Sequence, residues 1–541
     1  MRIPTAILLL SPILAGATIR VSDGTPTDTQ TQIDASVDGD QVIITNGNFT
    51  WSSGVSISGK GITLSGLGAG GFFARSVTAL TIGTGSKVFT VASGLKITNS
   101  ESVIAFATAG NGTLPERMEG TVTSYSGTTL TLDITTTAGS GTFHPWTIAR
   151  PHTTKITRST GSAVSITSDM SHNTYIERIF FQCDGSGAET ARAISVDENG
   201  STKIPVIRDC WFRQDNNLAI GKTTTRFLVH NCSFDSWFDY NYPGGKGVNT
   251  IAIGCNYVGT PGTFGYMWGR TNTFGANDPG GTNNMYLEDN WFVGLFLGCL
   301  DWADNAKGVA RRNIFDQCCI TVHGEDTGVD GTRHWEIYDN AFHSVNDLAA
   351  LGYNMANGYV YCRGQSGVIT SNYVDDIDVP AWSSVWEWRF QLQSIRKAGA
   401  GCYTAYPAGR QHGQDCCLAG VTNQITNAIC IWSNAITGGA DGNAFNHTQY
   451  DPDDCGNGQL QADYVVENRD YKTNQVMTGW VRFQYPHPLH ILAAESPPPS
   501  VPARIGPGRS GSRFVRSAAP PLLVLWIGIL TMRTLGKLRR K

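Results

Sequence analysis

Short runs in which apolar and polar residues alternate recur along the middle of the chain and predict β-strands. A run such as WEIYDNAF ends in a bend residue, Asn340, which is followed two residues later by a large apolar residue. That apolar position recurs at Phe212, Phe234, Val258, Phe292, Phe315, Phe342, Val374 and Ile436. Intervals within this series include 22, 24, 23 and 27 residues. A period in the twenties that is carried by strand residues, without the framework of leucine-rich repeats, predicts a parallel β-helix.

The bend position holds the same few residue types in coil after coil. Its occupants are Cys210, Cys232, Asn256, Asn290, Asn313, Asn340, Asn372 and Asn434. Asn tolerates left-handed backbone at a tight bend, and amides stacked on successive coils can form a ladder of hydrogen bonds. A small buried thiol can take the same place. We therefore expect these Asn and Cys residues to be structural.

The Asn repeat and the coil length resemble the pectate-lyase-like superfamily of right-handed parallel β-helices. Segments such as MYLEDNWF, HGEDTGVDGTRHWEIYDNAF, YPAGRQHGQD and ENRDY are similar to an exported group of that superfamily found in bacteria and phages. The resemblance runs from about residue 25 to residue 490. It implies an all-β, single-stranded, right-handed parallel β-helix. It does not specify the activity, because the superfamily contains lyases, hydrolases, epimerases and non-catalytic adhesins.

The N-terminal part of the chain divides into segments of different composition. Residues 1–17 combine one Arg, an apolar stretch and a small-x-small motif, which predicts a secretory signal peptide. Residues 18–75 resemble the cap and first coils of such proteins. Residues 76–150 alternate around Ser-Gly turns and predict an inserted small antiparallel β module, which resembles a β element of phage tail proteins. Residues 151–490 then form the main β-helix.

The C-terminal part has a different character. Residues 491–521 form a linker rich in Pro, Gly and Arg that cannot bury a core. Residues 522–541 join a short hydrophobic segment to a basic tail. Linker, apolar segment and tail resemble bacterial sorting signals, and a plain membrane anchor is the alternative. We therefore expect an extracellular or cell-surface protein.

Charge and cysteine content narrow the possible partners. A formal net charge of −4 gives no general field for binding nucleic acid, so an acidic substrate would need a local group of Arg side chains. The chain has 13 Cys, and an exported protein could form disulfides from them. Cys402 with Cys416 or Cys417 is one such pairing. The preferred partner is a polysaccharide.

Three side chains are candidates for catalysis. Counting back from each bend Asn places Asp301, His323 and Arg363 at comparable points in three successive coils. Carboxylate, imidazole and guanidinium groups about one or two rungs apart could move a proton while the Arg holds a sugar carboxylate. A structural role in turns and surface ion pairs is the alternative for each of them.

The long turn after His323 suggests substrate or metal contacts. It carries Glu325, Asp326 and Arg333. Its carboxylates could bind Ca²⁺, although a regular calcium-binding loop is absent and no metal ligand is assigned. Glycoside hydrolysis is the alternative chemistry, with Asp301 paired to Glu325 or Asp326.

Aromatic and Arg residues farther along the chain are typical of a carbohydrate groove. Trp388, Arg389 and Arg410 could stack on sugar rings and bind their acidic groups. Packing of a long loop on the solenoid would explain the same residues equally well.

One further column is predicted to be structural. Glu288, Arg311 and Tyr338 stand two residues before successive Asn bends, on the outer face of the second strand. We expect Glu288 and Arg311 to form an exposed ion pair of about 0–1 kcal/mol.

The sequence therefore predicts an exported β-helix protein that binds an acidic polysaccharide and degrades it by β-elimination or hydrolysis. A non-catalytic surface adhesin and a trimeric phage-type tailspike are the alternatives. Cofactors other than Ca²⁺ are not expected.

Overall fold

The computed structural model describes most of the chain between residues 17 and 489. The described ranges are 17–67, 72–76, 78–95, 97–107, 116–144, 146–167, 172–183, 191–197, 203–214, 218–221, 227–236, 251–253, 279–282, 284–293, 300–302, 307–316, 320–322, 334–343, 360–362, 366–375, 390–392, 428–437, 447–448, 467–468 and 470–489. The predicted signal peptide, the linker and the C-terminal apolar segment fall almost entirely outside these ranges, as does the Cys402 pairing, so they stay predictions.

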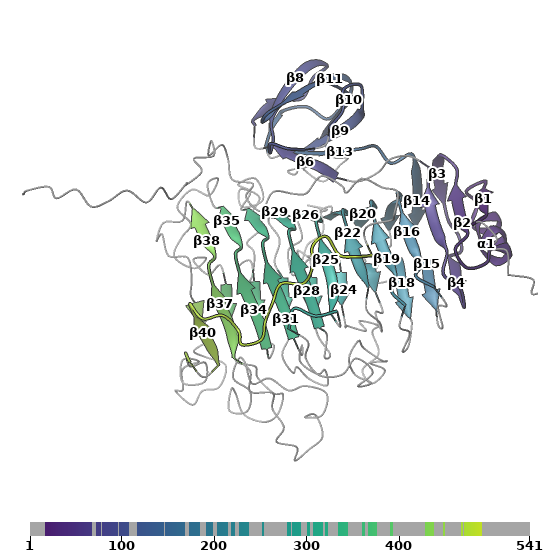
Figure 1. Ribbon diagram of the computed structural model, residues 1–541. Coiled ribbons are helices and arrows are strands. Elements are labelled where there is room, and N and C mark those ends of the chain that lie inside the picture. The colour runs from purple at the N-terminus through teal and green to yellow at the C-terminus, as the bar shows by residue number, and fades with distance from the viewer. Residues whose placement is uncertain are drawn as a thin grey trace, which may run out of the picture. The chain divides into compact units, whose positions relative to one another are not determined.

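Three long parallel sheets form the solenoid (Figure 1). Sheet A has 12 strands: β1 (Ile19–Ser22), β2 (Gln41–Ile44), β5 (Thr63–Gly66), β16 (Tyr175–Glu177), β19 (Val206–Arg208), β22 (Leu228–His230), β25 (Met285–Glu288), β28 (Lys307–Arg311), β31 (His334–Tyr338), β34 (Ser366–Thr370), β37 (Ile429–Trp432) and β40 (Tyr471–Thr473). Sheet B has 10: β3 (Gly47–Thr50), β14 (Thr154–Arg158), β17 (Phe180–Cys183), β20 (Trp211–Gln214), β23 (Ser233–Ser236), β26 (Trp291–Val293), β29 (Ile314–Asp316), β32 (Ala341–His343), β35 (Tyr373–Asp375) and β38 (Ala435–Thr437). Sheet C also has 10: β4 (Val55–Ser58), β15 (Gly161–Thr167), β18 (Ala191–Asp197), β21 (Leu218–Gly221), β24 (Ile251–Ile253), β27 (Leu300–Trp302), β30 (Ile320–Val322), β33 (Val360–Cys362), β36 (Phe390–Leu392) and β39 (His447–Thr448).

From β4 onward the chain visits the sheets of the solenoid in the order C, A and B in successive coils. Strands β27, β28 and β29 make one coil, and β30 starts the next beside β27. Crossovers between parallel strands are almost always right-handed. The predicted right-handed parallel β-helix is therefore confirmed. Helix α1 (Pro26–Ala35) packs on the first coils and contributes Ile33 to their core. Its 10 residues are too few to span a bilayer. No longer apolar helix occurs elsewhere in the described ranges.

An antiparallel β module interrupts the solenoid between β5 and β14. Its 6-stranded sheet has the order β6 (Phe72–Ser76), β13 (Trp146–Ala149), β9 (Ser102–Ala107), β10 (Arg117–Ser126), β11 (Thr129–Ala138) and β8 (Gly85–Thr90). Strands β7 (Leu80–Thr81) and β12 (Thr142–Phe143) form a small second sheet. The module has its own core around Phe89 and Trp146, whose rings meet edge to face. The inserted antiparallel module is thus present, with a core separate from that of the solenoid.

Side-chain ladders fill the interior where the repeat predicted them. Asn313 donates from Nδ2 to Oδ1 of Asn340 (3.0 Å) and to the carbonyl of Leu287 (3.0 Å). The same bonds link Asn residues from Asn290 to Asn434. The adjacent rings stack with centroids 4.8 Å apart, as between Phe315 and Phe342. The predicted structural role is confirmed for the Asn residues from Asn290 to Asn434, whereas Asn256 lies outside the described ranges.

The backbone at the bend differs from the prediction in one detail. The residue with left-handed backbone is not the Asn but its predecessor: Asp289, Arg312, Asp339, Ser371 and Ser433 all have φ between 54° and 59°. The Asn amide instead bonds neighbouring coils, because its side chain points into the interior.

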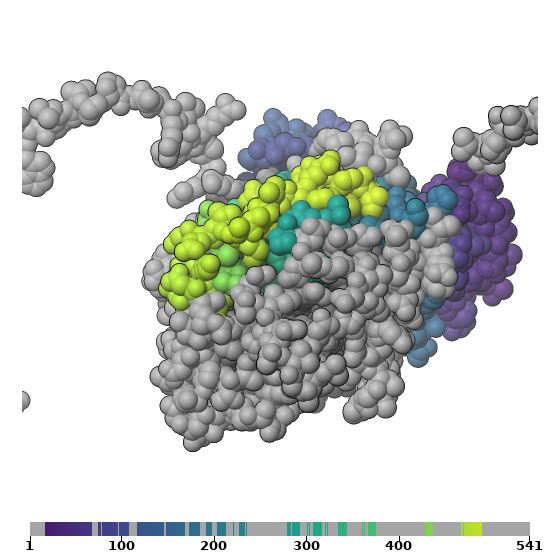
Figure 2. Space-filling view, turned by 60° about the horizontal axis from the view of Figure 1, so that its bottom comes forward, coloured from purple at the N-terminus to yellow at the C-terminus, as the bar shows by residue number. Residues whose placement is uncertain are grey.

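The last described segment lies across the outer face of sheet A. We call residues 474–489 the C-terminal strap. Figure 2 shows it in yellow, and Figure 1 shows it crossing from β40 toward the earlier strands. Trp480, Phe483 and Leu489 pack on the outer residues of sheet A, including Tyr286 and Tyr338. The strap thereby covers a face that the alternation of the strands alone would leave open to solvent.

Candidate functional site

The register of sheet C aligns the middle residues of its later strands. The register pairs Asp301 with Thr321, Thr321 with Tyr361, Tyr361 with Gln391, and Gln391 with His447. We call this set the sheet C column. Its neighbours within the strands are buried: Leu300, Trp302, Ile320, Val322, Val360 and Cys362. Because successive strand residues lie on opposite faces, the column positions are on the outer face.

The sheet C column offers varied chemistry at regular intervals. It contains a carboxylate, an alcohol, a phenol, an amide and an imidazole. Parallel strands are about 4.8 Å apart, so the column extends for roughly 19 Å along the solenoid axis. Such a row can follow an extended polymer and place proton-transferring groups beside it.

Only one of the predicted site residues lies in the described ranges. Asp301 lies in β27, within the sheet C column. The other predicted site residues lie outside the described ranges and stay predictions: His323, Glu325, Asp326, Arg333, Arg363, Trp388, Arg389 and Arg410.

The register differs from the predicted alignment. Asp301 pairs with Thr321 and, through it, aligns with Tyr361, rather than with the His and Arg that follow those two strands. Counting back from the Asn could not find this, because the corner between sheets C and A varies in length. That corner spans residues 303–306, 323–333 and 363–365 in three successive coils. The sequence does indicate this register, in the triplets LDW, ITV, VYC and FQL. The two outer residues of each triplet are apolar, and the middle residue is the member of the sheet C column.

A second group of polar residues lies under the strap on sheet A. Arg311 pairs with Glu288 at 2.6 Å, and their side chains are 1% and 0% exposed. The guanidinium also donates to the strap carbonyls of Phe483 and Gln484, at 2.8 Å each. The predicted ion pair is therefore confirmed, but the prediction that it is exposed was wrong, because the strap covers it.

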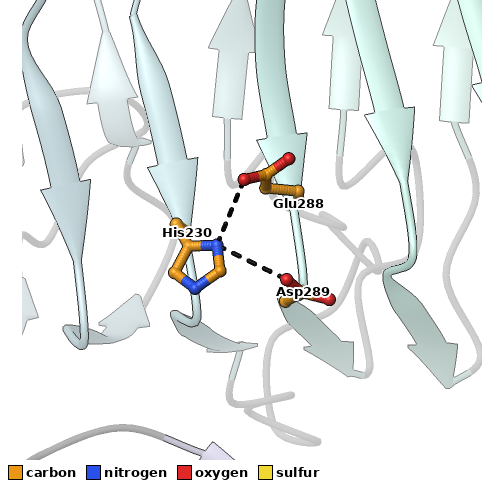
Figure 3. Close-up of side chains that lie close together, drawn as sticks. All are labelled: His230, Glu288 and Asp289. Carbon is orange, nitrogen blue, oxygen red and sulfur yellow. Dashed lines mark ion pairs between the residues drawn. The ribbon is translucent and has the colours of Figure 1, made fainter. Parts of the chain in front are cut away.

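His230 extends this group by one coil. Its Nδ1 lies 3.5 Å from Glu288 Oε1 and 3.5 Å from Asp289 Oδ2 (Figure 3). The strap completes the surroundings, because Tyr485 donates its hydroxyl to Asp289 (2.7 Å to Oδ2) and the His487 amide donates to Glu288 (3.0 Å). His230 ends β22, Glu288 ends β25 and Asp289 follows it directly, while Tyr485 and His487 belong to the strap.

The two carboxylates under the strap have different proton affinities. Burial would raise the pKa of Glu288, but the nearby His230 and the charge of Arg311 hold this pKa at about 2. Burial raises the pKa of Asp289 to about 6, and the charge of Glu288 adds to the rise. Glu288 is therefore the anion of the pair, and Asp289 is the more easily protonated.

Another anchor fastens the strap farther along sheet A. Glu336 accepts hydrogen bonds from Trp480 Nε1 (2.8 Å), from the Gly280 amide (2.6 Å) and from His334 Nε2 (3.0 Å) when that nitrogen is protonated. This outer face therefore binds a segment of its own chain. The sheet C column remains the better candidate for substrate.

Known proteins resemble this chain only remotely. No protein-family model and no curated protein matches the chain. Among solved structures, the alginate lyase from Paenibacillus sp. is 9% identical and covers 78% of this chain and 97% of its own, with a TM-score of 0.37. A PL6 family polysaccharide lyase from Pseudopedobacter saltans is 11% identical over 81% of this chain and 89% of its own, with a TM-score of 0.31. The tailspike protein gp49 from Pseudomonas phage LKA1 is 11% identical over 76% and 69%, with a TM-score of 0.28.

Proposed function

We propose that this protein binds an acidic polysaccharide along the sheet C column and cleaves it by β-elimination. The observation that carries the proposal is the register of sheet C, which aligns Asp301, Thr321, Tyr361, Gln391 and His447 on successive rungs. A polymer that runs parallel to the solenoid axis would meet a new polar side chain at about every 4.8 Å.

β-Elimination requires three functions at the sugar. A cation must neutralise the uronate carboxylate, a base must take the proton from C5, and an acid must protonate the leaving oxygen as the C4–O bond breaks. We assign these roles to Arg363, His323 and Tyr361 in that order. His323 and Arg363 directly follow the last residues of β30 and β33 in sequence.

The remaining residues are proposed to hold the polymer. Thr321 and Gln391 offer hydrogen bonds to hydroxyl groups within the column. Asp301 and His447 would bind sugars at either side of the cleavage point. The outer contacts proposed from the sequence, Glu325, Asp326, Arg333, Trp388, Arg389 and Arg410, would extend the subsites.

Glycoside hydrolysis is less well supported than elimination. An acid and a nucleophile or base, both carboxylates, normally flank the glycosidic bond. In the described part of the column Asp301 is the one carboxylate. A Ca²⁺ requirement remains a proposal, tested by measuring turnover with and without a calcium chelator.

The test uses uronate polymers and the ultraviolet absorbance of the unsaturated product. Tyr361→Phe removes one hydroxyl and is expected to lower kcat by about 10²- to 10⁴-fold. Tyr373→Phe is the matched control, because Tyr373 belongs to the same coil but lies in sheet B. His323→Ala and Arg363→Ala should likewise abolish turnover.

Two results would contradict this proposal. Equal turnover by Tyr361→Phe and by the control would remove Tyr361 from the mechanism. Binding of a uronate polymer by the unaltered protein, with no unsaturated product and no new reducing ends, would refute cleavage and favour the adhesin alternative.

A further inference from the structure

The cluster of His230, Glu288 and Asp289 has the geometry of a metal-binding site. One ligand atom from each residue lies within 4.8 Å of the other two, and all three residues are buried. His230 comes from one coil and the two carboxylates from the next, so their side chains converge from adjacent strands (Figure 3).

The distances within the cluster fit ligands around a metal ion. A direct hydrogen bond between an imidazole and a carboxylate is normally about 2.7–2.9 Å long. Here Nδ1 of His230 is 3.5 Å from an oxygen of Glu288 and 3.5 Å from an oxygen of Asp289. Tetrahedral ligands bound at about 2.0–2.1 Å are separated from one another by roughly 3.3–3.4 Å. The two separations measured from Nδ1 are therefore close to that value.

The surrounding groups orient both carboxylates. The second oxygen of Glu288 accepts from Arg311 Nε at 2.8 Å, and the second oxygen of Asp289 accepts from the Tyr485 hydroxyl at 2.9 Å. Hydrogen bonds of this kind fix metal-binding carboxylates in position. The His487 amide donates to the ligand oxygen of Glu288, and the single hydroxyl proton of Tyr485 is shared between the two oxygens of Asp289; a carboxylate oxygen has lone pairs for both a hydrogen bond and a metal ion.

We propose that His230, Glu288 and Asp289 bind a divalent first-row transition metal ion such as Zn²⁺ or Mn²⁺. One imidazole nitrogen and two carboxylate oxygens suit such ions, whereas Ca²⁺ takes 6–8 oxygen ligands. Water is the expected fourth ligand. This site is distinct from the sheet C column and does not depend on the function proposed there.

The bound ion would fasten the strap to the solenoid. Tyr485 and His487 belong to the strap, and both donate to the ligand carboxylates. An ion that holds those carboxylates in place also holds the acceptors of the strap. Removing the ion should therefore loosen the strap without unstacking the Asn ladder.

The experiment measures metal binding by the full chain after treatment with a chelator. We expect one equivalent of Zn²⁺ or Mn²⁺ to bind per chain, with faster hydrogen exchange in the strap of the metal-free protein. X-ray absorption of the Zn²⁺ form should show a shell of nitrogen and oxygen at about 2.0–2.2 Å without sulfur. That spectrum needs no variant, so it decides the outcome even if a variant fails to fold.

Variants identify the ligands. His230→Gln and Asp289→Asn should each raise the dissociation constant at least about 100-fold. Glu177→Gln is the matched control, because Glu177 is a buried carboxylate of the same column that pairs with Arg208. This control should leave the dissociation constant unchanged.

Several results would overturn the metal site. These are no bound equivalent, a sulfur shell that indicates cysteine ligands, or equal affinity in Asp289→Asn and Glu177→Gln. In any of these cases the cluster is a charge network of protein groups alone.

Discussion

Replacing Arg311 with Met should release the C-terminal strap while the solenoid stays folded. Arg311 connects the two parts directly: it pairs with Glu288 on sheet A and donates to the strap carbonyls of Phe483 and Gln484. It also donates to the Tyr338 hydroxyl at 3.2 Å. Met keeps much of the side-chain volume but removes the charge and every one of these donors.

The size of the effect follows from the burial of the pair. Both side chains are at most 1% exposed, so Arg311→Met leaves the buried Glu288 carboxylate without the guanidinium, and only His230 and the His487 amide remain beside it among the described contacts. Breaking a buried ion pair in this way costs about 3–5 kcal/mol. If the strap detaches, Glu288 becomes hydrated and its burial no longer costs free energy. The destabilisation caused by Arg311→Met therefore cannot exceed the free energy with which the strap docks on sheet A. The double variant Glu288→Gln with Arg311→Met removes the unpaired charge and should lose only about 1–2 kcal/mol for the missing hydrogen bonds.

Hydrogen exchange followed by mass spectrometry measures strap opening separately from global unfolding. Exchange of strap amides in Arg311→Met should be roughly 10²- to 10³-fold faster, while the amides of the Asn ladder keep their protection. Arg482→Met is the matched control, because Arg482 pairs with Asp339 at 3.0 Å but is 47% exposed. That exposed pair should contribute only about 0–1 kcal/mol. Equal strap exchange in the two Met variants would refute the argument that burial makes the Arg311 pair important.

Two further predictions concern stability. Burial lowers the pKa of His152 to about 4, so the native state binds fewer protons than the unfolded state between about pH 4 and 6.5. The free energy of unfolding should therefore fall by about 1–3 kcal/mol as the pH drops through this window, and His152→Gln should flatten that slope; an unchanged slope in this variant would contradict the argument. Asn340→Ala removes the oxygen that accepts from the Asn313 backbone amide and side chain, and should lower the free energy of unfolding in chemical denaturation by about 3–5 kcal/mol. Asn434→Ala, at the end of the ladder, should lower it by about 1–2 kcal/mol. Equal losses would contradict the cooperative role of the ladder.

The interior of the solenoid could be predicted from the sequence. Asn340 and Phe342 belong to a repeat whose members stack on equivalent residues of neighbouring coils, so one coil largely specifies the next. Each prediction depended on residues close together in the chain, and a periodic pattern preserves that information. Even so, the left-handed backbone was expected at the Asn rather than at the residue before it.

The column on sheet C could be predicted only in part. Asp301 was identified, but its neighbours Thr321 and Tyr361 were not, because the corner between sheets C and A changes length from coil to coil. Counting residues back from the Asn therefore does not give the strand register on the other side of such a corner. The apolar residues that flank each column member carry the register instead, since they must face the core.

The outer face of sheet A was decided by tertiary structure alone. Alternation along β25 and β28 placed Glu288 and Arg311 outside the solenoid, and that much the sequence determined. Their exposure to solvent depends on the C-terminal strap, which includes Phe483 and Tyr485 and comes from a distant part of the chain. No periodicity connects the strap to the strands beneath it. Local pattern therefore specified which side chains leave the core, and a long-range contact determined which of them are buried.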